Sequence, residues 1–243
     1  MKLGLIGFPL SHSYSKKYFE EKFKRENITG CSYELYPIES IDVFPELVRS
    51  EKVMGLNVTI PYKESVLKFC NQTSQLVKAI GAANCLKISD GFVLAENTDA
   101  IGFEKSIMPL IKNTYTKALV LGSGGSSRAV QYVLRKIGLA TTVVSRKKTS
   151  SHLSYEELSP DRIAQYDVIV NTTPLGMFPN QSDMPPIPIE GLNKDQLIYD
   201  LIYNPPETML LKKAASRGAH CVNGMDMFII QAEESWKIWN RLE

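Results

Sequence analysis

The residue types best suited to chemistry gather in residues 57–63, which read Asn-Val-Thr-Ile-Pro-Tyr-Lys. They overlap the end of the apolar run 53–60, which predicts a buried strand. The proline at 61 ends this strand and can open a short helix. An open α/β sheet places its ligand crevice at such strand ends. There Asn57 and Thr59 could hold sugar-like hydroxyls, and a partly desolvated Lys63 could exchange a proton. Taken alone, the stretch is equally typical of a surface lysine beside turn-forming polar residues.

Two later segments supply a second amide and a carboxylate. Asn84 follows Gly-Ala-Ala, and Asp99 ends the sequence Glu-Asn-Thr-Asp. Asp99 could form an ion pair with Lys63, or it could be the acid of a helix N-terminus. Burial would lower the pKa of Lys63 and the carboxylate would raise it, and the sequence leaves that balance open. Hydride transfer from a secondary alcohol needs a group to take the hydroxyl proton, and Lys63 suits this better than any of the three histidines.

Serines near the N-terminus form another candidate pair. Ser13 and Ser15 lie in the sequence Ser-His-Ser-Tyr-Ser, after the first predicted strand. Their hydroxyls could contact a ligand carboxylate. For Ser13, the sequence alone favours a second role, which is to cap the helix that follows.

A glycine-rich turn predicts a dinucleotide site. An apolar run at 118–121 leads into Gly-Ser-Gly-Gly and then a helix, which is the context that a dinucleotide fingerprint requires. Gly122 permits a tight turn, and Gly124 and Gly125 let the backbone approach a pyrophosphate at the positive end of the helix. Ser127 stands where the third glycine falls in simple spacing, so an ordinary glycine turn is the alternative.

The end of the following strand favours NADP over NAD. An NAD site places an acid about 20 residues after the glycines, where it binds the ribose 2′-hydroxyl. This chain has no acid there and carries Arg146, Lys147 and Lys148 in succession after Ser145. Such cations suit a 2′-phosphate, and a solvated basic turn is the plainer alternative.

The elements that must position these groups alternate between strands and helices, which predicts an α/β fold. In the first part the pattern predicts strands at 2–7, 33–38, 53–60, 84–88 and 92–96, and helices at 14–26, 41–49, 62–69 and 74–80. Ser-Asp-Gly at 89–91 is a hairpin turn signal. After a connecting helix at 99–111, the pattern predicts strands at 117–121, 140–145, 166–170, 196–201 and 219–222, and a last helix at 225–242. In this second block we expect parallel strands with helices on both faces.

Composition argues against several classes of function. The chain has 28 Lys+Arg against 26 Asp+Glu, a net charge of +2, which is no electrostatic signature of nucleic-acid or membrane binding. With 44% hydrophobic residues and no apolar run of transmembrane length or signal peptide, the sequence predicts a globular cytoplasmic protein. The four cysteines are scattered, so we expect neither a metal site nor a disulfide framework. The oligomeric state is not readable, which leaves a homodimer open.

Taken in order, the motifs resemble those of the shikimate dehydrogenase family, NADP-dependent enzymes that interconvert 3-dehydroshikimate and shikimate in aromatic amino-acid biosynthesis. The match covers nearly the whole chain. Its motifs are His-Ser-x-Ser from His12, Asn-Val-Thr-x-Pro-x-Lys at 57–63, Gly-Ala-x-Asn at 81–84, Asn-Thr-Asp-x-x-Gly at 97–102, Gly-x-Gly-Gly at 122–125, Asn-Thr-Thr-Pro-Leu-Gly-Met at 171–177, Asp-x-x-Tyr-x-Pro at 200–205, and Asn-Gly at 223–224 with Gln231.

The resemblance implies a substrate-binding and catalytic α/β domain at 1–99 plus 224–243, with the last helix returning to it, and a Rossmann-like NADP-binding domain at 100–223. It assigns Lys63 and Asp99 to the catalytic pair. The implied substrate-binding residues are Ser13, Ser15, Asn57, Thr59, Asn84, Tyr203 and Gln231. The implied cofactor-binding residues are Gly122, Ser123, Gly124, Gly125, Ser126, Ser145, Arg146, Lys147, Thr172 and Gly224.

Departures from the family pattern and rival functions remain. Cys85 replaces a threonine, and Ser-Arg-Lys from Ser145 stands for Asn-Arg-Thr. We therefore expect the cations at 146–148 to bind the adenosine phosphate.

The rival functions are those of a quinate/shikimate dehydrogenase that uses NAD, a non-catalytic ligand sensor on the same fold, and a one-carbon folate dehydrogenase. The basic turn favours NADP, and the retained Lys63 argues against a sensor. Ser13 and Gln231 suit a small hydroxylated carboxylate better than a pterin.

Overall fold

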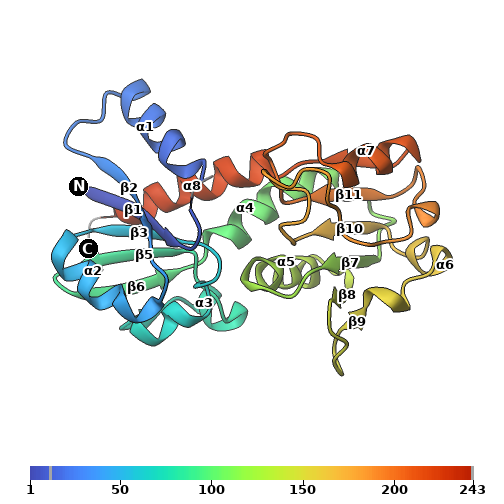
Figure 1. The fold of residues 1–243 in the computed structure, drawn as a ribbon, viewed down its shortest axis with the longest axis horizontal. Helices are drawn as coiled ribbons and strands as arrows, with labels where there is room; N and C mark the ends of the chain where they lie inside the picture. The colour runs from blue at the N-terminus through green and yellow to red at the C-terminus, as the bar shows by residue number, and fades with distance from the viewer. Residues whose placement is uncertain (11–12, 242–243) are drawn as a thin grey trace. The chain divides into compact units, whose positions relative to one another are not determined.

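The computed structural model describes residues 1–10 and 13–241, so His12 of the first motif lies outside the described residues. The chain divides into two compact units, one of Met1–Thr98 with Ala232–Glu243 and the other of Asp99–Gln231. Each unit is built around one β-sheet with helices packed against it (Figure 1). The α/β fold class predicted from the sequence is therefore confirmed.

The first unit has a mixed sheet with the strand order β2-β1-β3-β5-β6-β4. Its strands are β1 (Lys2–Gly7), β2 (Ser32–Pro37), β3 (Gly55–Val58), β4 (Gln72–Thr73), β5 (Cys85–Ser89) and β6 (Phe92–Glu96). β1 runs parallel to both β2 and β3, whereas β5 is antiparallel to β3 and to β6. Asp90 and Gly91 have φ of 47° and 81°, the turn geometry that closes a two-residue hairpin, so the predicted hairpin is confirmed.

Two apolar clusters cover the two faces of this sheet. The helical segments are α1 (Ser15–Arg25), η1 (Ile41–Val43), α2 (Phe44–Glu51), η2 (Ser65–Phe69), α3 (Gln75–Ile80) and the C-terminal part of α8 (Met225–Trp239). Leu5 of β1 shares one cluster with Phe19 of α1 and Trp239 of α8. Ile6, the next residue of β1, shares the other cluster with Phe44 of α2. Adjacent strand residues thus face opposite layers, as the pleat requires.

The second unit has an all-parallel sheet with the order β12-β11-β10-β7-β8-β9. Its strands are β7 (Lys117–Leu121), β8 (Ala140–Ser145), β9 (Leu153–Ser154), β10 (Val168–Asn171), β11 (Leu197–Asp200) and β12 (His220–Val222). Its helical segments are α4 (Thr98–Ile107) from its second residue on, η3 (Met108–Leu110), α5 (Gly125–Lys136), η4 (Tyr155–Glu157), α6 (Pro160–Ile163), η5 (Ile189–Gly191), α7 (Met209–Ser216) and the start of α8. If β7 is counted as the first strand of the unit, the order reads 6-5-4-1-2-3, which is the doubly wound order of dinucleotide-binding domains.

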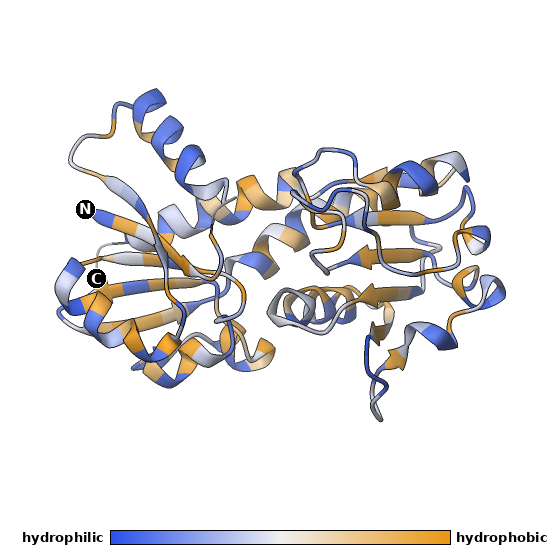
Figure 2. Ribbon diagram, in the orientation of Figure 1, coloured by the Kyte–Doolittle hydropathy of each residue, from blue (hydrophilic) through white to orange (hydrophobic). Residues whose placement is uncertain are grey.

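The hydrophobic pattern explains this second sheet. β7, β10 and β11 are buried along almost their whole length, as expected of parallel strands covered on both faces. Figure 2 shows these strands as largely hydrophobic, whereas helices such as α1 alternate polar and apolar residues. The parallel arrangement predicted for the second block is confirmed.

Several predicted element boundaries are wrong, and two short strands were missed. Pro61 does not open a helix, because it lies in a turn and η2 begins only at Ser65. The helix expected to run through 111 ends at Ile107 and gives way to a 3₁₀ turn that contains Pro109. Proline has no backbone N–H and cannot continue an α-helix. The two-residue strands β4 and β9 are too short to show any periodicity.

The last helix is shared by the two units, and the division falls after Gln231 and not at Gly224. Its first turns belong to the second unit because they pack tightly there. A Cβ on Gly224 would lie 2.1 Å from the carbonyl oxygen of Leu201, and the ring of Phe228 lies 4.7 Å from that of Tyr203.

Candidate active site

The parallel strands of the first unit meet at a switch point, with β2 on one side of β1 and β3 on the other. At the carboxyl ends of β1 and β3, the backbone N–H of Thr59 donates to the carbonyl of Ile6 at 2.9 Å. A Cβ on Gly7 would lie 2.3 Å from Cγ2 of Thr59, so a glycine is needed for this close approach. Ligand crevices of open α/β sheets lie at such points, and half-buried Thr59 is at this one.

Asn57 of β3 is buried, and its amide is bonded within the unit. Its Nδ2 donates to the carbonyl of Asn84 at 3.2 Å and to Oγ of Ser235 at 2.9 Å, and its Oδ1 accepts from the Tyr33 hydroxyl at 2.8 Å. Both N–H bonds of the amide are therefore committed to protein acceptors. The Asn57 side chain can therefore make a further hydrogen bond to a ligand only through Oδ1, which has accepted one bond and can accept a second.

Asn84 lies directly before β5, and its side chain is paired with the first residue of α4. Oδ1 of Asn84 accepts from the backbone N–H of Thr98 at 2.6 Å, and Nδ2 donates to Oγ1 of Thr98 at 2.9 Å. Oγ1 of Thr98 lies 3.1 Å from Oγ of Ser235. The predicted site did not include Thr98, Ser235 or Tyr33. A threonine at a helix start was a signal for Thr98, but a serine within a helix and a tyrosine within a strand give none.

Lys63 lies in the turn that follows β3 and is half-buried. Its carbonyl accepts from the backbone N–H of Ala83 at 2.8 Å, and the carbonyl of Asn84 accepts from the backbone N–H of Val58 at 2.9 Å. These bonds hold the backbone of the lysine turn beside the segment that carries Asn84. The structure thus brings Asn57, Thr59, Asn84 and the Lys63 turn to one edge of the first unit.

The two predicted serines lie at the start of α1. The backbone N–H of Ser15, the first residue of α1, donates to Oγ of Ser13 at 3.3 Å. The N-cap of α1 is Tyr14 and makes no side-chain cap bond, so the capping role expected of Ser13 is wrong, and Ser13 bonds the first helical residue from one position earlier. Both serine side chains are half-buried.

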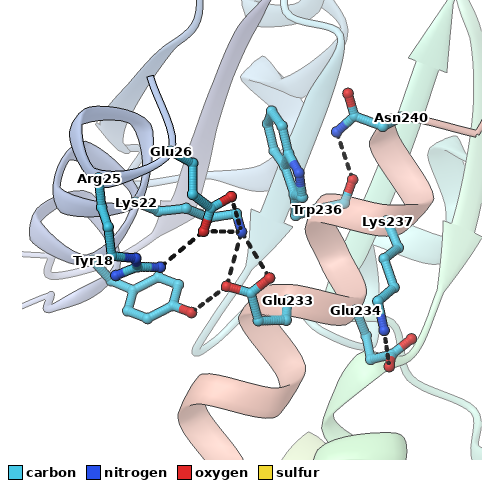
Figure 3. Close-up of polar contacts among 9 residues, drawn as sticks. All are labelled: Tyr18, Lys22, Arg25, Glu26, Glu233, Glu234, Trp236, Lys237 and Asn240. Atoms are coloured by element: carbon cyan, nitrogen blue, oxygen red, sulfur yellow. Dashed lines mark hydrogen bonds and ion pairs between the residues drawn. The ribbon is translucent and has the colours of Figure 1, made fainter. Parts of the chain in front are cut away.

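A charged cluster fixes α1 to α8 within the first unit (Figure 3). The buried ammonium of Lys22 lies 2.9 Å from a carboxylate oxygen of Glu26 and 2.8 Å from one of Glu233. The Tyr18 hydroxyl donates to Glu233 at 2.5 Å, and burial together with that carboxylate raises the pKa of Tyr18. The helix that begins at Ser15 is therefore anchored to the C-terminal helix.

Asp99 is the second residue of α4 and is buried. A carboxylate in the first turn of a helix is favourably placed for the helix dipole, as the sequence analysis allowed. Asp99 is counted with the second unit and Lys63 with the first. The ion pair between them stays a prediction.

The second unit has its own switch point, between β7 and β10. Gly122 follows β7 with φ of 108°, a conformation that favours glycine. Its added Cβ would lie 2.7 Å from Oγ1 of Thr172, whose hydroxyl donates to the carbonyl of Leu121 at 2.7 Å. Thr172 therefore lies against the glycine turn.

The start of α5 fits the phosphates of a dinucleotide. Gly124 is its N-cap, no side chain caps the helix among the described residues, and a Cβ added to Gly124 would meet no atom within 4 Å. Open space beside Gly124, at the positive end of a 12-residue helix, is what a pyrophosphate requires. Ser127, in place of the third glycine, is buried and donates to the carbonyl of Gly122 at 2.7 Å. Of the other predicted contacts, Ser123 is exposed, and Gly125 and Ser126 begin the helix.

The residues of the basic turn after β8 differ in how their side chains are already bonded within the protein. Ser145 is buried, and its hydroxyl donates to the carbonyl of Lys147 at 2.6 Å. Lys148 forms an ion pair with Glu157 at 2.7 Å. The exposed side chains of Arg146 and Lys147 therefore remain the better candidates for a 2′-phosphate.

A buried carboxylate, which was not among the predicted site residues, lies behind the Thr172 segment. Asp200, at the end of β11, accepts from Nδ2 of Asn171 at 2.9 Å and from the hydroxyl of Thr208 at 2.7 Å. Oδ1 of Asn171 in turn accepts from the backbone and hydroxyl of Thr173. Burial raises the pKa of Asp200 to about 6, although its hydrogen-bond donors limit the rise.

Three further predicted residues belong to the second unit. Tyr203 is half-buried against Phe228, Nε2 of Gln231 donates to the carbonyl of Phe228 at 3.0 Å, and Gly224 is buried. The predicted substrate-binding residues are thus divided between the units. Within residues 1–10 and 13–241 there is no cluster of three or more metal-ligating side chains and no helix long and apolar enough to cross a membrane.

A dinucleotide-type parallel sheet, joined to a unit with an amide, hydroxyl and lysine at a strand end, defines a two-domain oxidoreductase that uses a nicotinamide dinucleotide. A sequence model described as "Shikimate dehydrogenase substrate binding domain" matches residues 5–86. The NADP(+) shikimate dehydrogenase of Methanococcus aeolicus is 35% identical over 98% of this chain and 91% of its own length. The chain belongs to the shikimate dehydrogenase family.

Solved structures agree in fold. The shikimate dehydrogenase of Aquifex aeolicus has a TM-score of 0.88 and 34% identity, with 99% of this chain and 92% of that chain covered. A quinate dehydrogenase from Corynebacterium glutamicum in complex with NAD has a TM-score of 0.86 and 26% identity, with 100% and 94% covered. The fold alone therefore does not distinguish shikimate from quinate, or NADP from NAD.

Proposed function

We propose that this protein catalyses the reversible NADPH-dependent reduction of 3-dehydroshikimate to shikimate. The observation that carries the proposal is the strand end at which Asn57, Thr59, Asn84 and the Lys63 turn meet in one unit of a shikimate dehydrogenase family member. Amides and hydroxyls are the groups that recognise a small polyhydroxylated acid. A half-buried lysine beside them supplies a group that exchanges protons.

The substrate would be held mainly by the first unit. Thr59 and Asn84 line the strand end, Asn57 offers its Oδ1, and Ser13 and Ser15 at the start of α1 would bind the carboxylate. Tyr203 and Gln231 complete the proposed set from the second unit. Because the amides are already fixed by internal bonds, little side-chain entropy would be lost when the substrate binds.

The glycine turn and the basic turn would hold NADP. The start of α5 from Gly124 to Ser126 would bind the pyrophosphate, and Gly122, Ser123, Thr172 and Gly224 would complete the cofactor-binding set. Arg146 and Lys147 would bind the 2′-phosphate, with Ser145 shaping their turn. NADPH, when bound, supplies the hydride.

Lys63 would act on the oxygen at C3 of the substrate. Its Nζ would donate a proton to that oxygen during reduction and take the proton back during oxidation. Asp99 would hold the ammonium in place as its ion-pair partner.

The test is nicotinamide absorbance at 340 nm with shikimate and quinate crossed against NADP and NAD. We expect turnover chiefly with shikimate and NADP. Strong turnover with quinate or NAD would favour the alternative dehydrogenase class. A folded protein that turns over no pair would overturn the proposal and favour a ligand sensor.

We also propose a cytoplasmic location with no macromolecular partner beyond a second copy of the chain. Light scattering would test the homodimer.

A further inference from the structure

We infer that Ser235 of α8 is a positioning residue for the substrate site, although it lies outside every motif of the family resemblance. Ser235 is fully buried, and its Oγ joins two segments of the first unit. It accepts from Nδ2 of Asn57 at 2.9 Å and lies 3.1 Å from Oγ1 of Thr98, so either hydroxyl can donate to the other. The inference rests on the proposed function, because it concerns residues proposed to hold the substrate.

The bonds around Ser235 form a continuous network from β3 to α4. Asn57 donates to Ser235 and to the carbonyl of Asn84, and Asn84 is doubly bonded to Thr98. The Tyr33 hydroxyl closes the network at the Oδ1 of Asn57. All of these side chains are at most 6% exposed, so water cannot replace a bond that is lost.

The network determines which groups face a ligand. Asn57 could rotate its amide by 180° if nothing fixed it, which would exchange Oδ1 for Nδ2. The carbonyl of Asn84 can only accept, so it holds Nδ2 in the observed orientation, in which Ser235 accepts from the second N–H and Tyr33 donates to Oδ1. The pairing of Asn84 with Thr98 likewise fixes the first residue of α4, which precedes Asp99 in the chain.

α8 is also held from its other side. Glu233 lies two residues before Ser235, about 200° around the helix, and carries the charged contact to α1 (Figure 3). The ionic contact anchors the helix, whereas the Ser235 hydroxyl contacts the polar groups behind the proposed site. Removal of that hydroxyl should therefore affect substrate binding specifically.

The test is Ser235→Ala, with KM and kcat measured for shikimate, the Kd of NADP, and the melting temperature. We expect the KM for shikimate to rise about tenfold, because the second N–H of Asn57 loses its buried acceptor and the amide is held less firmly. The Kd of NADP should stay within about twofold. If the folded variant keeps the wild-type KM and loses only melting temperature or kcat, the role is structural and the inference is overturned.

Two further variants keep the inference testable. Ser106→Ala is the matched control, since it removes a serine hydroxyl bonded to Tyr199 at 2.8 Å in the second unit, and it should lower the melting temperature without changing the KM for shikimate. If Ser235→Ala does not fold, Tyr33→Phe removes the opposite end of the network and keeps the ring that stacks on Phe19. It should raise the KM about threefold, and an unchanged KM would contradict the inference. Inactive wild-type protein would instead refute the proposed function.

Discussion

The two switch points of this molecule are supported by different chemistry. In the first unit, the strand end is backed by neutral amides and hydroxyls, with Asn57 and Ser235 at the centre. In the second unit, the glycine turn is built from backbone and held by the buried hydroxyl of Ser127, and a buried carboxylate, Asp200, supports Asn171 at the end of β10. One site is thus organised to present side chains, and the other to present backbone N–H groups.

The difference matches the two ligands proposed. A polyhydroxylated acid is recognised through the direction of individual donors and acceptors, so its site needs side chains held in one orientation. A pyrophosphate is bound by any set of convergent N–H groups at a helix start, so its site needs close approach of backbone. Changes at one strand end should therefore leave the ligand of the other strand end bound.

The largest effect is expected from Lys63→Ala. Loss of the proton-exchanging group should lower kcat about 1,000-fold, because general acid–base catalysis contributes factors of this size. NADP binding, measured by fluorescence titration, should not change. Lys78→Ala, which removes an exposed lysine of α3 in the same unit, is the control and should keep full activity. A Lys63→Ala enzyme with more than a tenth of wild-type kcat would remove Lys63 from the chemistry.

The carboxylate in the second unit predicts a pH dependence that the neutral network cannot have. The pKa of Asp200 is about 6 in the folded protein and about 3.8 when unfolded. The protonated group therefore contributes stability that is complete below pH 4 and is lost as the pH rises through 6. The loss is on the order of 3 kcal/mol.

Urea unfolding of wild type and Asp200→Asn from pH 4 to pH 7 measures this contribution. The asparagine does not titrate, so the variant should gain in stability relative to wild type as the pH rises, and the difference should level off above pH 6. Parallel curves for the two proteins would show that Asp200 has an ordinary pKa.

Glycine substitutions should separate folding from cofactor binding. Gly122→Ala forces a side chain into φ of 108° beside Thr172, so it should lower stability and raise the Kd of NADP about 30-fold. Gly124→Ala meets open space in the protein, so it should keep stability and still weaken NADP binding. Scanning calorimetry measures the stability of both variants, and titration calorimetry measures their Kd for NADP, with the Kd for shikimate as the control. If Gly124→Ala bound NADP normally, the phosphates would have to lie elsewhere.

The smallest effect concerns the basic turn. Arg146→Ala should reduce the preference for NADP over NAD about tenfold, since a guanidinium–phosphate contact is a strong charge-assisted hydrogen bond. Lys148→Ala should change it less than threefold, because Lys148 already pairs with Glu157. Ratios of kcat/KM for the two cofactors measure both effects. Equal losses would mean that the pair with Glu157 opens when NADP binds.

Those parts of the fold that depend on hydrophobic periodicity and on short motifs could be predicted from the sequence. The long strands, the hairpin at Asp90 and the parallel second sheet follow from local patterns. The positions of Thr59 and Gly122 at strand ends follow from the same patterns. A helix start at Pro61 was mispredicted, because proline is as compatible with a turn as with a first helical turn.

The supporting residues could not be predicted. Ser235 acquires its role only when α8 packs against β3, 178 residues away in the chain. Asp200 likewise meets Asn171, 29 residues away, only through the pairing of β10 with β11. Nothing in a single buried serine or aspartate indicates which distant group it will bond.

The most direct test of the division between the two units is hydrogen exchange of the wild-type protein with each ligand alone. Shikimate should protect backbone amides around Thr59 and Asn84 and leave those at Gly122 to Ser126 unchanged. NADP should protect the glycine turn and leave the Thr59 segment unchanged. Protection of the glycine turn by shikimate alone, or of the Thr59 segment by NADP alone, would contradict the assignment of one ligand to each strand end.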